Sequence, residues 1–490
     1  MSVARHSGHA VAQSTNGIAL MTPPSVALDS SPEAPRRYPS WPAVVSWIFF
    51  DWAAQPYFTL ITTFVFAPYF ATNVAADPAT GQSLWGYATA SAGLIIALMS
   101  PVLGAIADAS GRRKPWIAAF GALLVIGASI MWIGKPGDQA AILPLLIAFG
   151  IATIGVEFAT VFNNAMMPTL VPPERIGRLS GTGWATGYIG GILSLILVLG
   201  FLAADPGTGR TLFGFTPLFG LNAAMHEGDR ITGPLTGLWF VIFVLPMFLF
   251  TPDYEARLPV RRAVRQGLRE LRQTLASLPN NRQMATFLIA NMVYTDALVA
   301  LFAFGGIYAA GTFGWHTIQI GVFGILLAIS GTFGAWLGGK LDDRIGPKKV
   351  ITGSMLLLLL AIAVILSMDR DRLFFVVEVT PPVPGGPLFA APAEKAYIVL
   401  GALIGAAAGP LQAASRTLLI RLAPPDRITQ YFGLFALSGK VTSFMAPLAV
   451  SLVTAITMSQ KAGMTVLVVF FLAGLVLLSR VRDPHARRPG

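Results

Sequence analysis

Apolar stretches of about twenty residues recur along the whole chain, and they decide what it can fold into. As an α-helix, a stretch of about this length crosses the hydrocarbon core of a bilayer. Only 12% of the 490 residues are charged, about half the share of a typical soluble protein. The stretches predict an all-α membrane protein with twelve spans, near residues 43–70, 84–107, 115–133, 141–167, 178–202, 233–250, 284–310, 317–340, 349–367, 396–420, 429–455 and 462–479.

Two loop patterns each occur once in both halves of the chain and in the same order. The first follows the second span of each half and reads Gly104-Ala-Ile-Ala-Asp108-Ala-Ser-Gly111-Arg112-Arg113-Lys114, then Gly339-Lys-Leu-Asp-Asp343-Arg344-Ile-Gly346-Pro-Lys348-Lys349. The second precedes the fifth span of each half and reads Pro172-Pro-Glu-Arg-Ile176, then Pro424-Pro-Asp-Arg-Ile428. The repetition predicts two parallel six-helix bundles, 43–250 and 284–480, an arrangement typical of rocking secondary transporters.

The distribution of Lys and Arg predicts the orientation of the chain. With both termini cytoplasmic, inner segments hold 25 of the 34 Lys and Arg and outer loops hold 7. Because positive residues concentrate on the cytoplasmic side, we expect both termini in the cytoplasm. The expected membrane is the plasma membrane, which is the inner membrane in a bacterium. Residues 1–42 are rich in Ser, Pro and Ala and predict a disordered tail, and 481–490 form a second cytoplasmic tail.

The linker 251–283 between the halves carries seven arginines and four leucines at helical spacing. This pattern fits a basic amphipathic helix on the cytoplasmic lipid surface. It fits a solvated linker equally well, because basic residues concentrate in cytoplasmic segments anyway.

Several function classes are disfavoured by the residues that are absent or scattered. The chain has no cysteine, and its five histidines lie in tails or outer loops, so we expect no metal site and no other cofactor. The Lys and Arg residues sit in short loops between spans, which argues against nucleic acid as a partner. A phosphate-binding loop of the ATPase type is missing, as is any nucleophile–base pair, so neither an ATP-driven pump nor an enzyme is expected.

Five ionisable residues fall inside the predicted spans: Asp51, Glu157, Asp296, Arg416 and Lys440. Charged groups in the membrane interior are costly and are usually functional. A buried carboxyl group tends to take up a proton, whereas a nearby Arg or Lys keeps it ionised. We expect the two deepest, Asp296 and Lys440, to form a pair in one state and to handle substrate or protons. For Asp51 and Arg416 an ion pair that closes an inner gate is an equal alternative.

Further polar residues on the same spans could bind substrate or only link helices: Asn164, Gln412 and Tyr294. Asn164 corresponds to Arg416 in the repeat, since each lies eight residues before a Pro-Pro pair.

The two copies of the first loop pattern resemble the signature loops of the major facilitator superfamily. Four further segments resemble the branch with the fungal autophagy-linked vacuolar amino-acid effluxers and their bacterial relatives: Phe50-Asp-Trp-Ala-Ala-Gln-Pro-Tyr57, Tyr294-Thr-Asp-Ala297, Gly409-Pro-Leu-Gln-Ala-Ala-Ser-Arg416 and Phe432-Gly-Leu-Phe-Ala-Leu-Ser-Gly-Lys440. The resemblance implies the major facilitator fold, transport, and amino acids as substrates. It also implies that spans 1, 4, 7 and 10 line a central cavity.

By the same resemblance, the loop carboxylates Asp108 and Asp343 meet the starts of spans 11 and 5. Such contacts would form in one state of the transporter and open in the other. The gating residues expected in these loops are Gly104, Asp108, Gly111, Arg112, Gly339, Asp343, Arg344 and Gly346. The alternative is that each loop only ends a span with ordinary basic anchors.

These observations favour a secondary active transporter that works by alternating access as a functional monomer. The expected cargo is a small polar or zwitterionic solute such as an amino acid, moved in the efflux direction, with a proton as coupling ion. A sugar–cation symporter or a drug exporter of the same fold is the first alternative. A membrane enzyme or lipid-handling protein is the alternative from another class.

Overall fold

The computed structural model describes residues 38–76, 78–278, 280–313, 315, 317–381 and 389–482. Of the predicted tails, 1–42 lies outside the described residues except for its last five, and 481–490 except for its first two. The first helix begins at Trp41, directly after Ser40 in an extended conformation.

Eleven helices among the described residues are long and apolar enough to cross a membrane, and they coincide with eleven predicted spans. The remaining span, the first in the chain, is also helical but is divided into shorter pieces. Pro56 ends the first piece and Pro68 lies in the third, and proline cannot donate to the helical ladder. The pieces are α1 (Trp41–Pro56), η1 (Tyr57–Phe64), α2 (Phe66–Tyr69) and η2 (Phe70–Val74). The predicted all-α, twelve-span fold is thus confirmed.

Five more spans complete the first half: α3 (Pro78–Ser110), α4 (Lys114–Ile130) with η3 (Met131–Ile133), α5 (Ile142–Asn164), α7 (Ile176–Leu197) with η6 (Val198–Leu202), and α9 (Thr232–Phe250). Short helical turns connect them: η4 (Gln139–Ala141), α6 (Met167–Leu170), η5 (Pro173–Arg175), η7 (Leu218–Gly220) and α8 (Glu227–Arg230).

The second half repeats this order: α11 (Arg282–Phe313), α12 (Thr317–Ile345), α13 (Pro347–Leu366), α14 (Pro392–Leu422), α15 (Ile428–Lys440) with α16 (Met445–Thr457), and α17 (Gln460–Ser479). The turn η8 (Pro425–Arg427) precedes α15 as η5 precedes α7. Between α13 and α14, two short strands, β1 (Arg372–Leu373) and β2 (Val377–Glu378), pair antiparallel.

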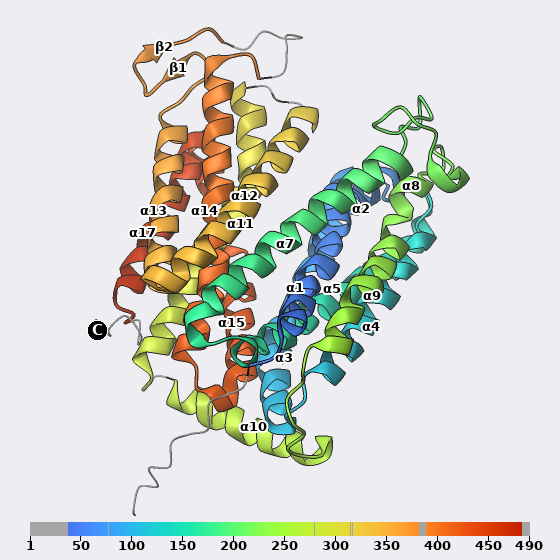
Figure 1. Cartoon of the computed structure of the whole chain (residues 1–490). Coiled ribbons are helices and arrows are strands. Elements are labelled where there is room, and N and C mark those ends of the chain that lie inside the picture. The colour runs from blue at the N-terminus through green and yellow to red at the C-terminus, as the bar shows by residue number, and fades with distance from the viewer. Residues whose placement is uncertain are drawn as a thin grey trace, which may run out of the picture. The chain divides into compact units, whose positions relative to one another are not determined.

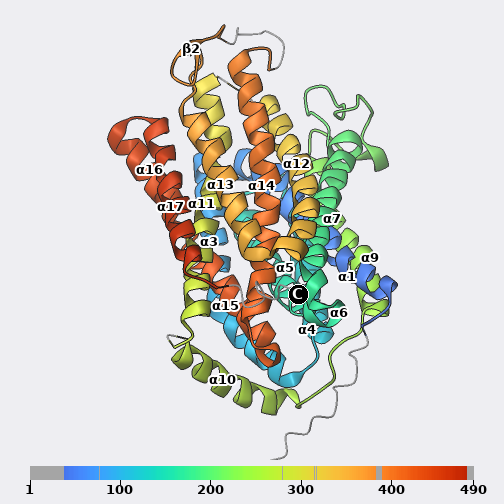
Figure 2. The ribbon, with the colours of Figure 1, turned by 60° about the vertical axis from the view of Figure 1, so that its left-hand side comes forward.

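The linker between the halves contains a helix, α10 (Val260–Ser277), with five arginines and one glutamate. In Figure 1 and Figure 2 this helix lies across the ends of the spans, at the opposite end from β1 and β2. A membrane normal runs along the spans, so α10 lies close to parallel with the membrane plane.

The two halves meet near the α10 end, where α3 packs on α15 and α7 packs on α12 (Figure 1). Both contacts depend on glycine. A Cβ on Gly104 of α3 would lie 2.5 Å from the Thr429 carbonyl oxygen, and one on Gly339 of α12 would lie 2.7 Å from the Gly177 carbonyl oxygen. Only glycine allows backbones to approach this closely.

Candidate functional site

Arg416 of α14 lies at the centre of a polar cluster between the halves. Its guanidinium donates to Asn164 Oδ1 of α5 (2.9 Å) and to both the hydroxyl (3.1 Å) and the carbonyl oxygen (2.8 Å) of Ser180 of α7. Asp51 Oδ2 of α1 lies 3.7 Å from its Nη1, and the ring of Trp184 lies 5.4 Å from its Cζ. One side chain of the second half therefore contacts three spans of the first.

Burial makes these contacts necessary. Arg416 is 4% exposed, and a buried charge is tolerated only when it is paired and hydrogen-bonded. The planar guanidinium, with donors in a fixed fork, can serve several acceptors at once. Ser180 also donates to the Ala413 carbonyl oxygen (2.8 Å), one turn before Arg416 on α14. The cluster holds α14 against α5 and α7 in this conformation.

A second ion pair joins the halves through different helices. Lys440 Nζ, at the end of α15, donates to Glu157 Oε1 of α5 at 2.7 Å. Both side chains are partly exposed, at 34% and 20%. The expected pair of Lys440 with Asp296 is thus not formed in this conformation, because Lys440 reaches across to Glu157 of the first half instead.

Asp296 of α11 is a buried carboxylate with few polar neighbours, Thr442 being one of them. The residue is 1% exposed, and its Oδ1 has no hydrogen-bond partner among the described residues. Two residues earlier, the Tyr294 hydroxyl bonds the Ser415 hydroxyl of α14 at 2.7 Å. Gln412 contacts the Ala408 carbonyl oxygen of its own helix at 3.4 Å. Tyr294 therefore links two helices of the second half, while Asp296 remains a buried acid without a cation beside it.

The end of α3 meets the start of α15 through Asp108. Its two carboxylate oxygens accept the backbone N–H groups of Thr429 (3.2 Å) and Gln430 (2.7 Å), the first turn of that helix. The guanidinium of Arg113 bonds the same carboxylate at 2.5 Å. The free N–H groups of a helix start favour a carboxylate there. We call Asp108, Arg113, Thr429 and Gln430 the first latch.

The corresponding contact joins the end of α12 to the start of α7. Asp343 accepts the backbone N–H of Arg178 at 3.0 Å, and the Arg178 side chain lies 3.4 Å from its other oxygen. The preceding residue, Asp342, is 1% exposed and lies 3.7 Å from a guanidinium nitrogen of Arg421. We call Asp342, Asp343, Arg178 and Arg421 the second latch.

Gly111 and Gly346 end the two latch loops in the same way, with φ of +93° and +88°. Such backbone conformations favour glycine, which explains its recurrence in the sequence pattern. Arg112 and Arg344, also expected to take part in gating, are exposed on the surface. The structure places Arg113 rather than Arg112 at the Asp108 carboxylate.

The sequence prediction missed five participants: Ser180, Arg113, Asp342, Arg178 and Arg421. The pair Asp342-Asp343 was a signal, because the first loop has a single acid at this point. No sequence signal pointed to Ser180, since a serine among small residues on a span normally indicates helix packing.

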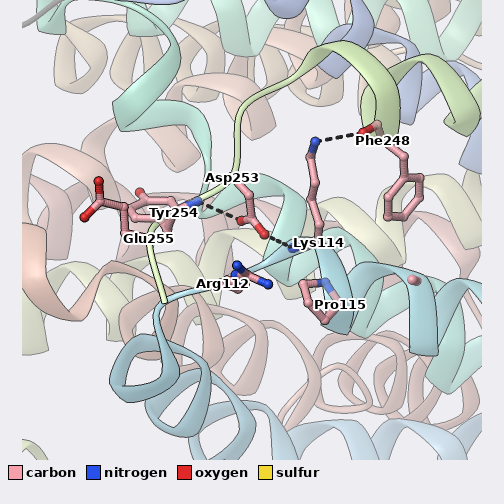
Figure 3. Close-up of a pocket in the computed structure, with 8 residues that line it drawn as sticks. Arg112, Lys114, Pro115, Phe248, Asp253, Tyr254 and Glu255 are labelled. Carbon is pink, nitrogen blue, oxygen red and sulfur yellow. Dashed lines mark hydrogen bonds between the residues drawn. The ribbon is translucent and has the colours of Figure 1, made fainter. Parts of the chain in front are cut away.

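The segment after α9 is fixed on the first latch loop (Figure 3). Asp253 accepts the backbone N–H groups of Arg113 (2.8 Å) and Lys114 (3.2 Å) at the start of α4. The Arg113 guanidinium stacks on Tyr254, 4.5 Å from the ring centroid. The Lys114 amine reaches the Phe248 carbonyl oxygen of α9 (2.9 Å). The linker to α10 is therefore part of the packing around the first latch.

Among the described residues, no three His, Cys, Asp or Glu side chains come together as a metal site would require. The chemistry that these residues offer is ionic and hydrogen-bonding.

The family described as "Vacuole effluxer Atg22 like" matches residues 173–489, more than half of the chain. The chain belongs to this family. The Major Facilitator Superfamily matches residues 18–195. An uncharacterised MFS-type transporter, YxiO of Bacillus subtilis, is 23% identical over 444 residues, covering 89% of this chain and 94% of the relative. Both family matches agree that this Atg22-like chain is an integral membrane transporter and not an enzyme.

Autophagy-related protein 22 of Cryptococcus neoformans is 25% identical over 321 residues, 64% of this chain. The match spans about half, 51%, of that fungal relative. Multidrug resistance protein MdtG of Proteus mirabilis is 26% identical over 299 residues, 60% of this chain and 65% of the relative.

Solved structures share the fold of this Atg22-like transporter. The transporter FucP in its outward conformation has a TM-score of 0.64 and 14% identity, covering 90% of this chain and 98% of that one. The human organic anion transporter MFSD10 also has a TM-score of 0.64, with 15% identity, covering 91% of this chain and all of that one.

Proposed function

We propose that the protein is a secondary active transporter that exports a small polar or zwitterionic solute, such as an amino acid, by alternating access coupled to protons. The observation that carries this proposal is that ion pairs join the two halves within their spans. Asp51 lies 3.7 Å from Arg416, and Glu157 bonds Lys440 at 2.7 Å. Each pair has its acid in the first half and its base in the second.

Separation of the halves would break these pairs and leave acids and bases without partners. An unpaired charge in the membrane interior costs several kcal/mol, so another ion must compensate it. A zwitterion supplies an ammonium group for the acids and a carboxylate for the bases. Such a solute would therefore favour the state in which both ion pairs are broken and the halves have separated there. Alternating access requires such a state.

The orientation follows from the 25 Lys and Arg on one side against 7 on the other. In this proposal the α10 end is cytoplasmic, both termini lie inside, and the membrane is the plasma membrane. The latches and the Arg416 cluster then close the cytoplasmic end, and the conformation described here is the one that faces outward. The protein works as a monomer, since each chain supplies both halves.

Counterflow uptake into proteoliposomes tests the proposal. Vesicles preloaded with one unlabelled amino acid, peptide or sugar at a time receive the same solute in labelled form. For at least one amino acid, we expect the labelled solute to accumulate transiently inside the vesicles. This uptake should saturate with concentration and should be stimulated by unlabelled solute on the opposite side of the membrane. A channel would show no such stimulation. If a sugar showed saturable counterflow and no amino acid did, the proposed substrate class would change from amino acids to sugars.

Drug export is a second candidate, favoured by the similarity to the multidrug resistance protein over 60% of the chain. Charged pairs between the halves disfavour a purely hydrophobic cargo, because such a cargo cannot compensate them. Lipophilic cations belong in the same counterflow panel. If the protein exported these cations and showed no amino-acid counterflow, drug export would be the better assignment.

A further inference from the structure

The outer surface of α10 carries two parallel stripes of opposite character. Val264, Leu268 and Leu275 are apolar and 37%, 46% and 47% exposed. Arg261, Arg265 and Arg272, all exposed, each lie three residues before one of them. Residues three apart are neighbours on a helix surface, so an apolar stripe runs beside a basic one.

The buried face of α10 is a separate surface that packs on α3. Ala263 is completely buried in a cluster with Ile106 and Ala109. A Cβ on Gly267 would lie 2.8 Å from the backbone of Ala105. The exposed apolar stripe is thus additional to the face that the protein covers.

The same helix contacts both sides of the first latch. Its buried face lies on the last turns of α3, which carry Asp108. Near its other end, Thr274 accepts a hydrogen bond at 3.1 Å from Arg427, two residues before Thr429. Arg257 precedes α10 in the sequence, and its backbone N–H donates to the Ser110 carbonyl oxygen at 2.9 Å. α10 therefore bridges the two elements that separate when this latch opens.

An anionic membrane surface fits both stripes together. α10 lies across the ends of the spans (Figure 2). The ends of helices that cross the hydrocarbon core lie close to the lipid headgroups. A helix in this position inserts an apolar stripe between headgroups and places its arginines at their phosphates. The guanidinium fork binds phosphate oxygens in pairs, and five arginines face one glutamate on this helix.

We propose that α10 is a binding site for anionic phospholipid headgroups, and that the bound lipid stabilises the closed first latch. Arg261, Arg265 and Arg272 hold the phosphates, while Val264, Leu268 and Leu275 enter the headgroup layer. A helix held on the membrane surface in this way keeps α3 and the start of α15 together. The lipid then acts on the conformational equilibrium without contact with the transported solute.

Lipid retention tests the site without any assumption about transport. The full chain is placed in bilayers of phosphatidylcholine with about one third phosphatidylglycerol, and the lipids that stay bound are measured by native mass spectrometry. We expect phosphatidylglycerol to be enriched, and the triple variant R261Q/R265Q/R272Q to lose about tenfold or more of this enrichment, since each arginine near an anionic surface contributes about 1 kcal/mol. The control K349Q/R480Q/R482Q removes three exposed charges of the same sign elsewhere and keeps the enrichment.

Spin-label distances test the effect on the latch. The chain has no cysteine, so Ala140→Cys and Gln460→Cys introduce the only two labels, one on each half at the end opposite α10. We expect phosphatidylglycerol to increase the long-distance population several-fold, and R261Q/R265Q/R272Q to abolish this increase. Equal retention of both lipids, or enrichment unchanged in the α10 variant, would overturn the site. Enrichment through α10 with unchanged distances would overturn its action on the latch.

Discussion

Asn164 of α5 and Arg416 of α14 occupy corresponding positions of the repeated halves and bond to each other, Nη1 to Oδ1 at 2.9 Å. Each lies eight residues before a Pro-Pro pair. Two positions related by the repeat meet near the pseudo-symmetry axis, where one carries an amide and the other a guanidinium. The repeat thus brought these side chains together, and their different chemistry allows a bond.

Replacement of Arg416 by glutamine should open the closed end. The change removes the cation from the partly buried Asp51 and from the buried Ser180 carbonyl oxygen. Loss of one partner of a buried pair costs about 3–5 kcal/mol. We expect the thermal unfolding temperature and the transport rate both to fall. The double variant Asp51→Asn/Arg416→Gln should recover part of the stability, because no lone buried charge remains. Equal losses in the single and double variants would show that the pair does not contribute.

The latch carboxylates should govern turnover more than affinity. Asp108→Asn or Asp343→Asn keeps the shape but weakens bonds to backbone N–H groups, each worth about 1.5–3 kcal/mol with a charged acceptor. We expect a shift of the conformational equilibrium on the order of tenfold or more, a lower maximal rate and a smaller change in KM. Asp371→Asn, in an exposed loop at the opposite end, is the matched control. Wild-type rates in both latch variants would refute the role.

The neighbours Arg112 and Arg113 should differ sharply. Arg113 is 3% exposed and bonds Asp108, whereas Arg112 is exposed. Arg113→Gln should lower the unfolding temperature and the transport rate, while Arg112→Gln should change stability by no more than about 0.5 kcal/mol. Thermal unfolding of the purified variants measures the difference. If Arg112→Gln proved the more damaging change, the assignment of the latch cation would be wrong.

The orientation can be measured with single cysteines in this cysteine-free chain. A membrane-impermeant thiol reagent applied to intact cells should label Ala140→Cys and leave Gln273→Cys on α10 unlabelled. Permeabilised cells provide the control, because both positions are exposed and should then react. The opposite pattern would reverse the proposed topology.

The fold was predictable from sequence because span length and the repeated loops depend on local patterns. The same holds for Gly111 and Gly346, whose positive φ requires glycine wherever the turn recurs. Pairing across the halves was not predictable in the same way. The sequence predicts a similar depth for Lys440 and Asp296, but α15 directs Lys440 to Glu157. The rotation of a helix about its axis is not fixed by a span that is apolar all round.

Asp296 is expected to carry the coupling proton even though Lys440 is not its partner here. A buried carboxylate without a cation is tolerable in a membrane only when it is hydrated or protonated. Asp296→Asn, which mimics the protonated form, should abolish accumulation driven by a pH gradient and leave solute exchange intact, because exchange needs no net proton movement. Proteoliposomes with and without an imposed pH gradient measure the two activities separately.

Glu157→Gln provides the comparison, since this acid has a bound lysine and should affect closure of the halves rather than proton coupling. We expect it to slow exchange and gradient-driven uptake by similar factors, whereas Asp296→Asn should separate the two. If Asp296→Asn still concentrates solute in response to the gradient, Asp296 is not the coupling site. Selective loss of gradient-driven uptake in Glu157→Gln would then assign the proton to the pair with Lys440.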